Sequence, residues 1–196
     1  MSEPARSPKS RIVLRPEVTR EQVEDAALDL DWLFLQNWPR GEDRPYEDVW
    51  VDRDERTWIH YVEDHLVEAR YLVVKGADVP AVESEARELL AAYRPEDALR
   101  AWDSATTADE RVEAVHLLAL TADPEDRSGS VAKLRAAASD DVTAVRRALV
   151  LVTTYVGWPE LRQLLEDMTS NDPVEAVRQE ARLALDGLGY QDSLER

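Results

Sequence analysis

The spacing of hydrophobic residues changes near Pro95 and divides the chain into two parts. Before this point, stretches rich in β-branched and aromatic residues alternate with stretches of helical spacing, whereas beyond it the helical spacing prevails. We predict a small α+β unit at residues 11–94 and an α-helical unit at 95–189. Residues 1–10, which hold prolines and no apolar run, are expected to form a disordered leader, and residues 190–196 a tail.

Two helices and one short strand are predicted around the centre of the front part. Arg11–Arg15 is a β-type run that Pro16 stops. Apolar residues at helical spacing then predict an amphipathic helix over Arg20–Gln36, and Thr19 has a glutamine three residues later, as in a capping box. A loop rich in proline and glycine follows. A second helix is predicted over Val79–Tyr93.

The segment between these helices is interpreted as a three-stranded antiparallel meander. Its strands are expected at Asp48–Val51, Thr57–Val62 and Leu66–Val74, which are rich in Trp, Ile, Tyr and Val and are separated by polar clusters. The alternative is one helix across Trp58–Val73, because several apolar residues there also have helical spacing. We prefer strands, since these residue types favour strands over helices.

Three apolar stripes in the rear part share one phase. They come into register when Val115, Val145 and Val177 are aligned, at offsets of 30 and then 32 residues. Stripes in one phase indicate equivalent helices that each press the same side inward. We therefore predict three helical hairpins, whose first helices are expected at Pro95–Ala105, Ser130–Ala138 and Trp158–Met168.

A turn aspartate followed by a Val-Arg pair occurs twice, as Asp140 with Val145-Arg146 and as Asp172 with Val177-Arg178. In these residues the chain resembles the short HEAT-like repeats of bacterial proteins, a kind also found in phycocyanobilin lyases. The resemblance covers about residues 95–188 and implies a HEAT-like solenoid, in which this aspartate and this pair recur in each repeat. The first repeat departs from the pattern, with Glu110 and His116 at the corresponding positions.

The repeated acidic and basic residues are interpreted as structural rather than functional. An aspartate that caps a helix and faces an arginine of the next repeat would fix the stacking of neighbouring hairpins. We expect such a ladder to consist of Asp140, Arg146, Asp172 and Arg178. Because three hairpins are few for an independent solenoid, the front unit is expected to cap the stack at the first hairpin.

Charge restricts the classes of partner. The net charge is −17, and Glu17–Glu68 alone holds 16 acidic residues against five arginines, a net of −11. Such a surface repels phosphate backbones and anionic lipids, which argues against direct binding of nucleic acid or membranes and favours a basic protein partner. HEAT-like DNA glycosylases use tryptophan and aspartate in a cationic channel, and Trp102 and Trp158 invite that comparison. Residues 96–196 carry 20 acids against 11 bases, which excludes a duplex-binding channel.

Aromatic residues gather within the acidic segment. Seven of the chain's 13 aromatic residues lie between Trp32 and Tyr61. Most are expected to fill a thin core, because one tryptophan buries roughly 150 Å² or more. Trp38 and Tyr46, assigned to the loop that also holds Arg40 and Arg44, are the candidates for a binding surface, since aromatic rings beside carboxylates can grip a basic side chain. Trp102 and Trp158 are added to these candidates.

Candidate chemistry is sparse. The chain has no cysteine, which excludes thiolate chemistry and disulfides, and its six glycines form no phosphate-binding loop. His60 and His65 lie near carboxylates but converge poorly for a metal, so a solvated hairpin end is preferred. His116 is expected to be a partly buried structural residue. We therefore predict no catalytic residue, no metal and no cofactor.

The function favoured by the sequence is a non-enzymatic protein–protein interaction module with an acidic, aromatic-rich surface. The first alternative is an immunity- or inhibitor-type protein that blocks a basic or nucleic-acid-binding partner. The second is an accessory factor or enzyme of a biosynthetic pathway, by analogy with the repeat-containing lyases. We expect a cytoplasmic protein, because the chain shows neither a signal peptide nor a membrane-spanning apolar run. Its oligomeric state stays open, and the partner site is expected where the front unit meets the first hairpin.

Overall fold

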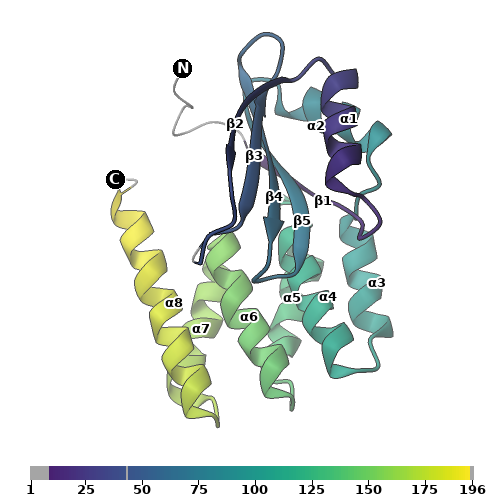
Figure 1. Ribbon diagram of the computed structural model, residues 1–196. Coiled ribbons are helices and arrows are strands. Elements are labelled where there is room, and N and C mark those ends of the chain that lie inside the picture. The colour runs from purple at the N-terminus through teal and green to yellow at the C-terminus, as the bar shows by residue number, and fades with distance from the viewer. Residues whose placement is uncertain (1–8, 43, 195–196) are drawn as a thin grey trace. The chain divides into compact units, whose positions relative to one another are not determined.

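The computed structural model describes residues 9–42 and 44–194, with side chains up to Gly189. The chain divides into two compact units between Tyr93 and Arg94 (Figure 1), and each is described by itself. In the described residues, the N-terminal unit holds a five-stranded antiparallel sheet with two helices, and the C-terminal unit holds six helices. This confirms the predicted succession of an α+β part and a mostly helical part.

The sheet has the strand order β1-β5-β4-β3-β2. Strands β2 to β5 form an antiparallel meander, and β1 joins it beside β5, so that β1 and β2 are the two edges. The strands are β1 (Lys9–Val13), β2 (Leu33–Trp38), β3 (Tyr46–Val51), β4 (Thr57–Asp64) and β5 (Ala69–Gly76).

Helices α1 (Arg20–Asp29) and α2 (Val79–Leu89) cover the same face of this sheet (Figure 1). Their apolar stripes, represented by Val23 and Val82, are buried against strand residues such as Ile59 and Leu72. The core residues of β4 and β5, Ile59 with Tyr61 and Leu72 with Val74, are every second residue, as expected when one face of a pleated sheet is packed on helices.

The prediction of a helix over Arg20–Gln36 is wrong in its second half. The helix begins as expected, because the backbone N–H of Gln22 donates to Thr19 Oγ1 at 3.3 Å. It ends at Asp29, and the chain then turns through Asp31, whose φ is +55°. The following residues become β2. Their helical spacing was misleading because consecutive large apolar residues also occur in an exposed edge strand.

The prediction of strands between the two helices is confirmed, but the predicted number of strands is too small. β3, β4 and β5 form the expected meander, and the alternative of a helix across Trp58–Val73 is wrong. β5 starts at Ala69 because the chain turns through residues 65–68. Of the predicted β-type run at Arg11–Arg15, the first three residues belong to β1, which pairs with β5 and ends at Val13.

Both ends of the predicted α+β unit differ from expectation. Lys9 and Ser10, assigned to a disordered leader, belong to β1, and residues 1–8 lie outside the described part. The helix predicted over Val79–Tyr93 ends at Leu89. The chain then extends beside the start of the fold, where the Tyr93 N–H donates to the carbonyl oxygen of Val13 at 2.8 Å. Pairing with the segment after β1 therefore ends the helix early.

The six helices of the C-terminal unit pack in two rows. In one row α4 contacts α6 and α6 contacts α8, and in the other α3 contacts α5 and α5 contacts α7. The predicted stripes are buried, as Leu149 and Ala181 are fully inaccessible. The helices are α3 (Pro95–Ser104), α4 (Ala108–Leu120), α5 (Ser128–Ala137), α6 (Thr143–Val156), α7 (Pro159–Asn171) and α8 (Glu175–Leu194).

The predicted tail at 190–196 is mostly helix, because α8 continues to Leu194, while residues 195 and 196 lie outside the described part. None of the helices in the described residues combines the length and the apolar character that crossing a membrane requires.

Candidate functional site

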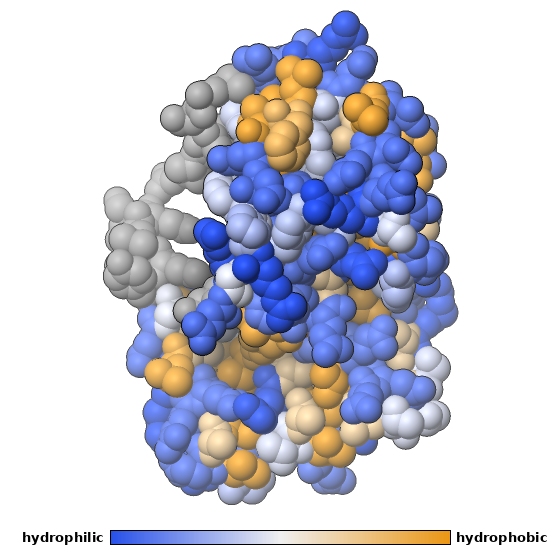
Figure 2. Space-filling model, viewed as in Figure 1, coloured by the Kyte–Doolittle hydropathy of each residue, from blue (hydrophilic) through white to orange (hydrophobic). Residues whose placement is uncertain are grey.

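The most unusual surface of the N-terminal unit lies on edge strand β2. Leu33, Phe34 and Leu35, named the β2 patch from here on, are consecutive and expose 49%, 58% and 44% of their surface. Figure 2 shows hydrophobic side chains near the start of β2, in the upper part of the view, with hydrophilic side chains around them. Single exposed apolar residues are ordinary, but three adjacent ones on a strand indicate an interaction surface.

The two edges of the sheet differ in how they are protected. β1 carries Lys9 and Arg11. Leu14, which follows β1 directly, forms an antiparallel bridge with Ala92. Charged side chains and covering segments are the usual devices that keep an edge strand from pairing with other chains. β2 has the sequence Leu-Phe-Leu-Gln-Asn-Trp and carries no charge. In the part of the chain that the structure describes, β1 is therefore the protected edge of the sheet and β2 the open one.

Pairing with β3 determines which side chains of β2 share a face. Phe34 lies opposite Trp50, and their rings meet edge to face with centroids 5.9 Å apart. Leu33 lies opposite Val51 on the other face. The register shifts between Phe34 and Gln36, which makes Leu35 the extra residue of a β-bulge. The β2 patch thus presents apolar side chains on both faces of the strand.

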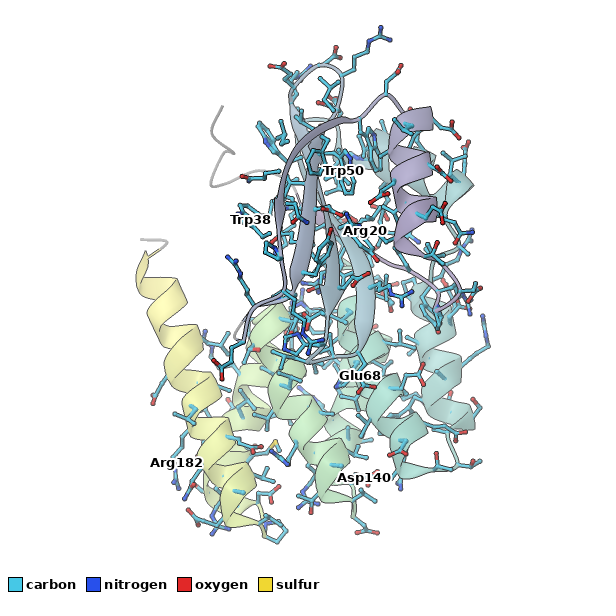
Figure 3. All side chains as sticks on the ribbon, viewed as in Figure 1. Arg20, Trp38, Trp50, Glu68, Asp140 and Arg182 are labelled. Carbon is cyan, nitrogen blue, oxygen red and sulfur yellow. The ribbon has the colours of Figure 1, made fainter. Side chains whose placement is uncertain are left out.

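A buried carboxylate holds β2 and α1 to the sheet. Asp48 of β3 is fully inaccessible, and its oxygens accept hydrogen bonds from Asn37 Nδ2 at 2.7 Å and from the Tyr46 hydroxyl at 2.9 Å. Arg20 at the start of α1 lies 3.0 Å from the same carboxylate (Figure 3). Burial and then the hydrogen bond to Asp48 raise the pKa of Tyr46 to about 12. These three partners of Asp48 are residues of the N-terminal unit itself, so we interpret the network as structural and not as a binding site.

Acidic side chains precede the β2 patch along the chain. Helix α1, which leads into β2, exposes Glu21, Glu24, Asp25 and Asp29. Asp31 follows two residues before the strand, in a largely exposed ion pair with Arg53 at 3.3 Å. Arg53 is already counted in the net charge of −11 over residues 17–68, so the area keeps its negative field. An apolar strand beside this field suits a partner that carries both apolar and basic side chains.

The aromatic candidates of the N-terminal unit lie in strands and not in the loop assigned to them. Trp38 is the last residue of β2 and packs against Val49, Val51 and Trp58, on the sheet face opposite to Trp50 (Figure 3). Tyr46 is the first residue of β3, with the guanidinium of Arg20 4.6 Å from its ring centroid.

Their basic neighbours do belong to the loop. Arg40 and Arg44 are exposed, and the Gly41 N–H donates to the carbonyl oxygen of Arg44 at 3.1 Å. These two arginines therefore remain available at the end of β2, whereas the rings of Trp38 and Tyr46 are half-buried.

The two tryptophans of the C-terminal unit are poorer candidates. Trp102 is half-buried on α3, and Trp158 is buried at the start of α7, where the guanidinium of Arg127 lies 5.4 Å from its ring centroid. Arg127 also pairs with Glu160 at 3.2 Å, and both line an open hollow of about 480 Å³ beside α5. The structure thus gives Trp158 a packing role and leaves no free ring face to a partner.

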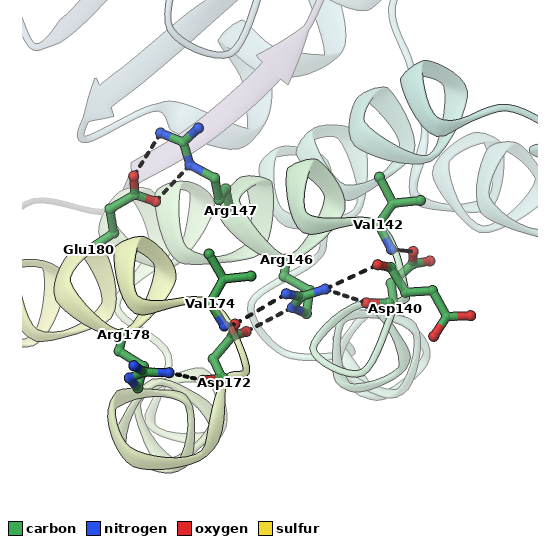
Figure 4. Close-up of polar contacts among 9 residues, drawn as sticks. Asp140, Val142, Arg146, Arg147, Asp172, Val174, Arg178 and Glu180 are labelled. Carbon is green, nitrogen blue, oxygen red and sulfur yellow. Dashed lines mark hydrogen bonds and ion pairs between the residues drawn. The ribbon is translucent and has the colours of Figure 1, made fainter.

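The predicted ladder residues meet in the C-terminal unit (Figure 4). Arg146 binds Asp172 through Nε and a terminal nitrogen, at 2.7 and 3.1 Å, and donates to the carbonyl oxygen of Asp140 at 2.8 Å. Asp172 also accepts from the Val174 N–H at 2.8 Å at the start of α8, and Arg178 donates to the carbonyl oxygen of Asp172.

The arginine that each turn aspartate contacts differs from the prediction in two respects. Each turn aspartate faces an arginine of the preceding hairpin and not of the next. In the first hairpin this arginine is Arg111, which lies 2.7 Å from Asp140, and not the residue at the position of His116. The alignment of the apolar stripes places His116 of α4 at the position of Arg146 of α6. It missed Arg111, because Arg111 lies more than one helical turn before His116 on α4.

Burial decides the electrostatics of the ladder. Removing Asp172 from water would by itself raise the pKa of its carboxyl group, but the hydrogen bonds from Arg146 and Val174 and the charge of Arg146 outweigh this effect. The pKa of Asp172 is therefore lowered, and the pair is ionised at neutral pH. These contacts join consecutive hairpins and offer no reacting group.

The histidines do not form a metal centre. His60 is buried, with Nδ1 2.5 Å from a carboxylate oxygen of Glu47, so that the preferred interpretation of a solvated hairpin end is wrong for it. His65 lies in the turn after β4, and His116 is buried on α4. Among residues 9–42 and 44–194, no three His, Cys, Asp or Glu residues are grouped so that they could hold a metal ion.

Sequence reasoning missed the β2 patch itself. Its signal is the uncharged stretch Leu33–Trp38, of which Leu33–Gln36 was included in a predicted helix and Trp38 in the loop after it. No protein-family model, curated protein or solved structure matches the chain.

Proposed function

We propose that the chain is a non-enzymatic protein-binding module. Its N-terminal unit recognises a basic protein partner through the β2 patch and the acidic residues beside it, and its helical unit is a HEAT-like scaffold. The observation that carries the proposal is the β2 patch, three exposed apolar residues on an unprotected strand next to an acidic helix.

Two further observations support the division of roles. The ionic side chains Arg146 and Asp172 bind each other in the interior of the helical unit, as structural contacts do. The two rows of helices and the recurrence of an Asp–Arg contact between successive hairpins support the HEAT-like arrangement. The exposed charges of α1, in contrast, have few ion-pair partners and remain available to a partner.

The test is affinity capture from an extract of the source organism at about 50 and about 300 mM salt, because screening weakens attraction between exposed charges. We expect the intact chain to retain a basic protein at the lower salt and much less of it at the higher. A variant with Glu21→Gln, Asp25→Asn and Asp29→Asn should retain several-fold less. The matched control, Glu113→Gln, Glu166→Gln and Asp186→Asn, removes the same charge from the helical unit and should bind as the wild type does.

Capture that is equal at both salt concentrations, or lost equally in the two variants, would contradict recognition through the acidic N-terminal surface.

A further inference from the structure

The backbone of β2 offers hydrogen-bonding groups as well as side chains. In an edge strand, every second residue directs its N–H and C=O away from the neighbouring strand. β2 is six residues long and, among residues 9–42 and 44–194, pairs with β3 on one side only, at the end of the strand order. An extended segment of another chain can therefore continue the sheet there, with main-chain hydrogen bonds for affinity and side-chain contacts for selection.

We propose that β2 receives an extended, lysine- or arginine-bearing segment of the partner as a sixth strand of the sheet. This inference rests on the proposed function and specifies how the partner binds.

The added strand would lie beside the β2 patch, whose apolar side chains occupy both faces of the sheet. Leu33 and Phe34 point to opposite faces, because they pair with Val51 and Trp50 respectively. Neighbouring side chains on one face of a sheet lie about 5 Å apart and stabilise the pairing. A segment in which apolar residues alternate with basic ones would therefore cover one part of the β2 patch and place its charges on the opposite face.

The charge of the chain selects this occupant over a second copy. Pairing of two β2 strands would bring together two acidic segments, each with a net charge of −11 over residues 17–68. A basic segment instead meets Asp29 and Asp31 at one end of β2, next to the β2 patch. Like charges across an interface disfavour a partner, whereas opposite charges favour it and speed encounter.

The bulge at Leu35 makes the pairing selective. It interrupts the regular ladder between Phe34 and Gln36, and such irregularities restrain indiscriminate pairing at an edge. A partner must follow this interruption with its own backbone, which a flexible extended peptide can do and a flat preformed edge strand cannot.

The probe is a synthetic peptide of eight residues that alternates valine and lysine, with blocked ends and a fluorescent label. The comparison peptide has the same sequence but carries N-methyl groups on the two central residues, one valine and one lysine. This change leaves every side chain and charge intact but removes one central N–H from each lateral edge of the peptide. Binding to the intact chain is followed by fluorescence anisotropy at low salt.

Two protein variants complete the design. Leu33→Lys with Leu35→Lys adds two charges to β2, as β1 has naturally, and spares the ring contact of Phe34. The control is Leu89→Lys with Leu183→Lys, which adds the same charge at leucines that are 48% and 71% exposed, on α2 and α8. Circular dichroism checks that both variants are folded.

We expect the wild type and the control to bind the unmodified peptide equally within about twofold. The methylated peptide and the β2 variant should each bind at least about tenfold more weakly, because main-chain hydrogen bonds are lost and like charges meet.

Equal binding of the two peptides would overturn strand addition and leave the proposed electrostatic recognition standing. Binding of neither peptide by the wild type would also overturn it, and the salt-dependent capture decides the proposed function separately. If sedimentation shows a wild-type dimer that the β2 variant abolishes, a second copy is the occupant, and the choice of a basic partner is overturned.

Discussion

Replacing Arg146 by alanine is expected to lower the free energy of unfolding of the helical unit by about 3–5 kcal/mol, the usual cost of removing one member of a buried ion pair. The side chains of Arg146 and Asp172 are 6% and 1% exposed, and they share two hydrogen bonds. Without the guanidinium, the Asp172 carboxylate stays buried and loses its ion-pair partner, and the Val174 N–H and the charge of Arg178 compensate it only in part. The measurement is denaturant unfolding of the intact chain followed by helical circular dichroism.

Arg147 is the matched control for this prediction. It follows Arg146 directly and also binds a carboxylate through two nitrogens, that of Glu180, at 2.9 and 2.6 Å. Its side chain is 57% exposed, so the loss in Arg147→Ala should stay below about 1 kcal/mol. Similar losses in the two variants would show that the ladder contributes no more than a surface pair.

Replacing Gly76 by alanine is expected to destabilise the N-terminal unit by about 3 kcal/mol or more, from backbone strain and overlap together. Gly76 has a φ of +144°, which side chains rarely allow, and it ends β5 opposite Thr57. A Cβ atom there would lie 2.2 Å from the carbonyl oxygen of Arg56 and 2.6 Å from Thr57 Cα. Both are backbone atoms of the neighbouring strand and its turn, so neither can move aside without opening the sheet.

The same change from glycine to alanine is expected to have the opposite effect on stability at Gly187. It lies within α8, and an added Cβ meets no atom within 4 Å. Gly187→Ala should therefore stabilise the helical unit by about 0.5–1 kcal/mol, the difference in helix propensity. Thermal unfolding of the two variants beside the wild type measures both effects. A Gly76→Ala protein as stable as the wild type would contradict the described geometry at the end of β5.

The helices of the rear part could be predicted because their apolar stripes are buried by neighbours of similar shape, so spacing and burial agree. β2 could not be predicted in the same way. Leu33 and Phe34 have the spacing of a helical stripe after Leu30, and the turn at Asp31 depends on a backbone conformation that its residue type does not require. Only pairing with β3 decides that this stretch is a strand, and pairing is a long-range contact that local spacing does not report.

The position of the candidate site was not predicted from the sequence. Trp38 and Tyr46 were selected as loop residues, whereas they end and begin strands and are partly covered by the fold. The exposed residues are instead Leu33 to Leu35, which an amphipathic pattern assigns to a core. Exposure could not be predicted here, since it follows from the place of β2 at the edge of the sheet.

The central proposal is that the N-terminal unit binds the partner and the helical unit supports it. Hydrogen–deuterium exchange of the intact chain, free and bound to the captured partner, tests this proposal most directly. We expect slower exchange of the backbone amides in Leu33–Trp38 on binding, with little change in α3 to α8. Slower exchange confined to the helical unit, with β2 unaffected, would contradict it.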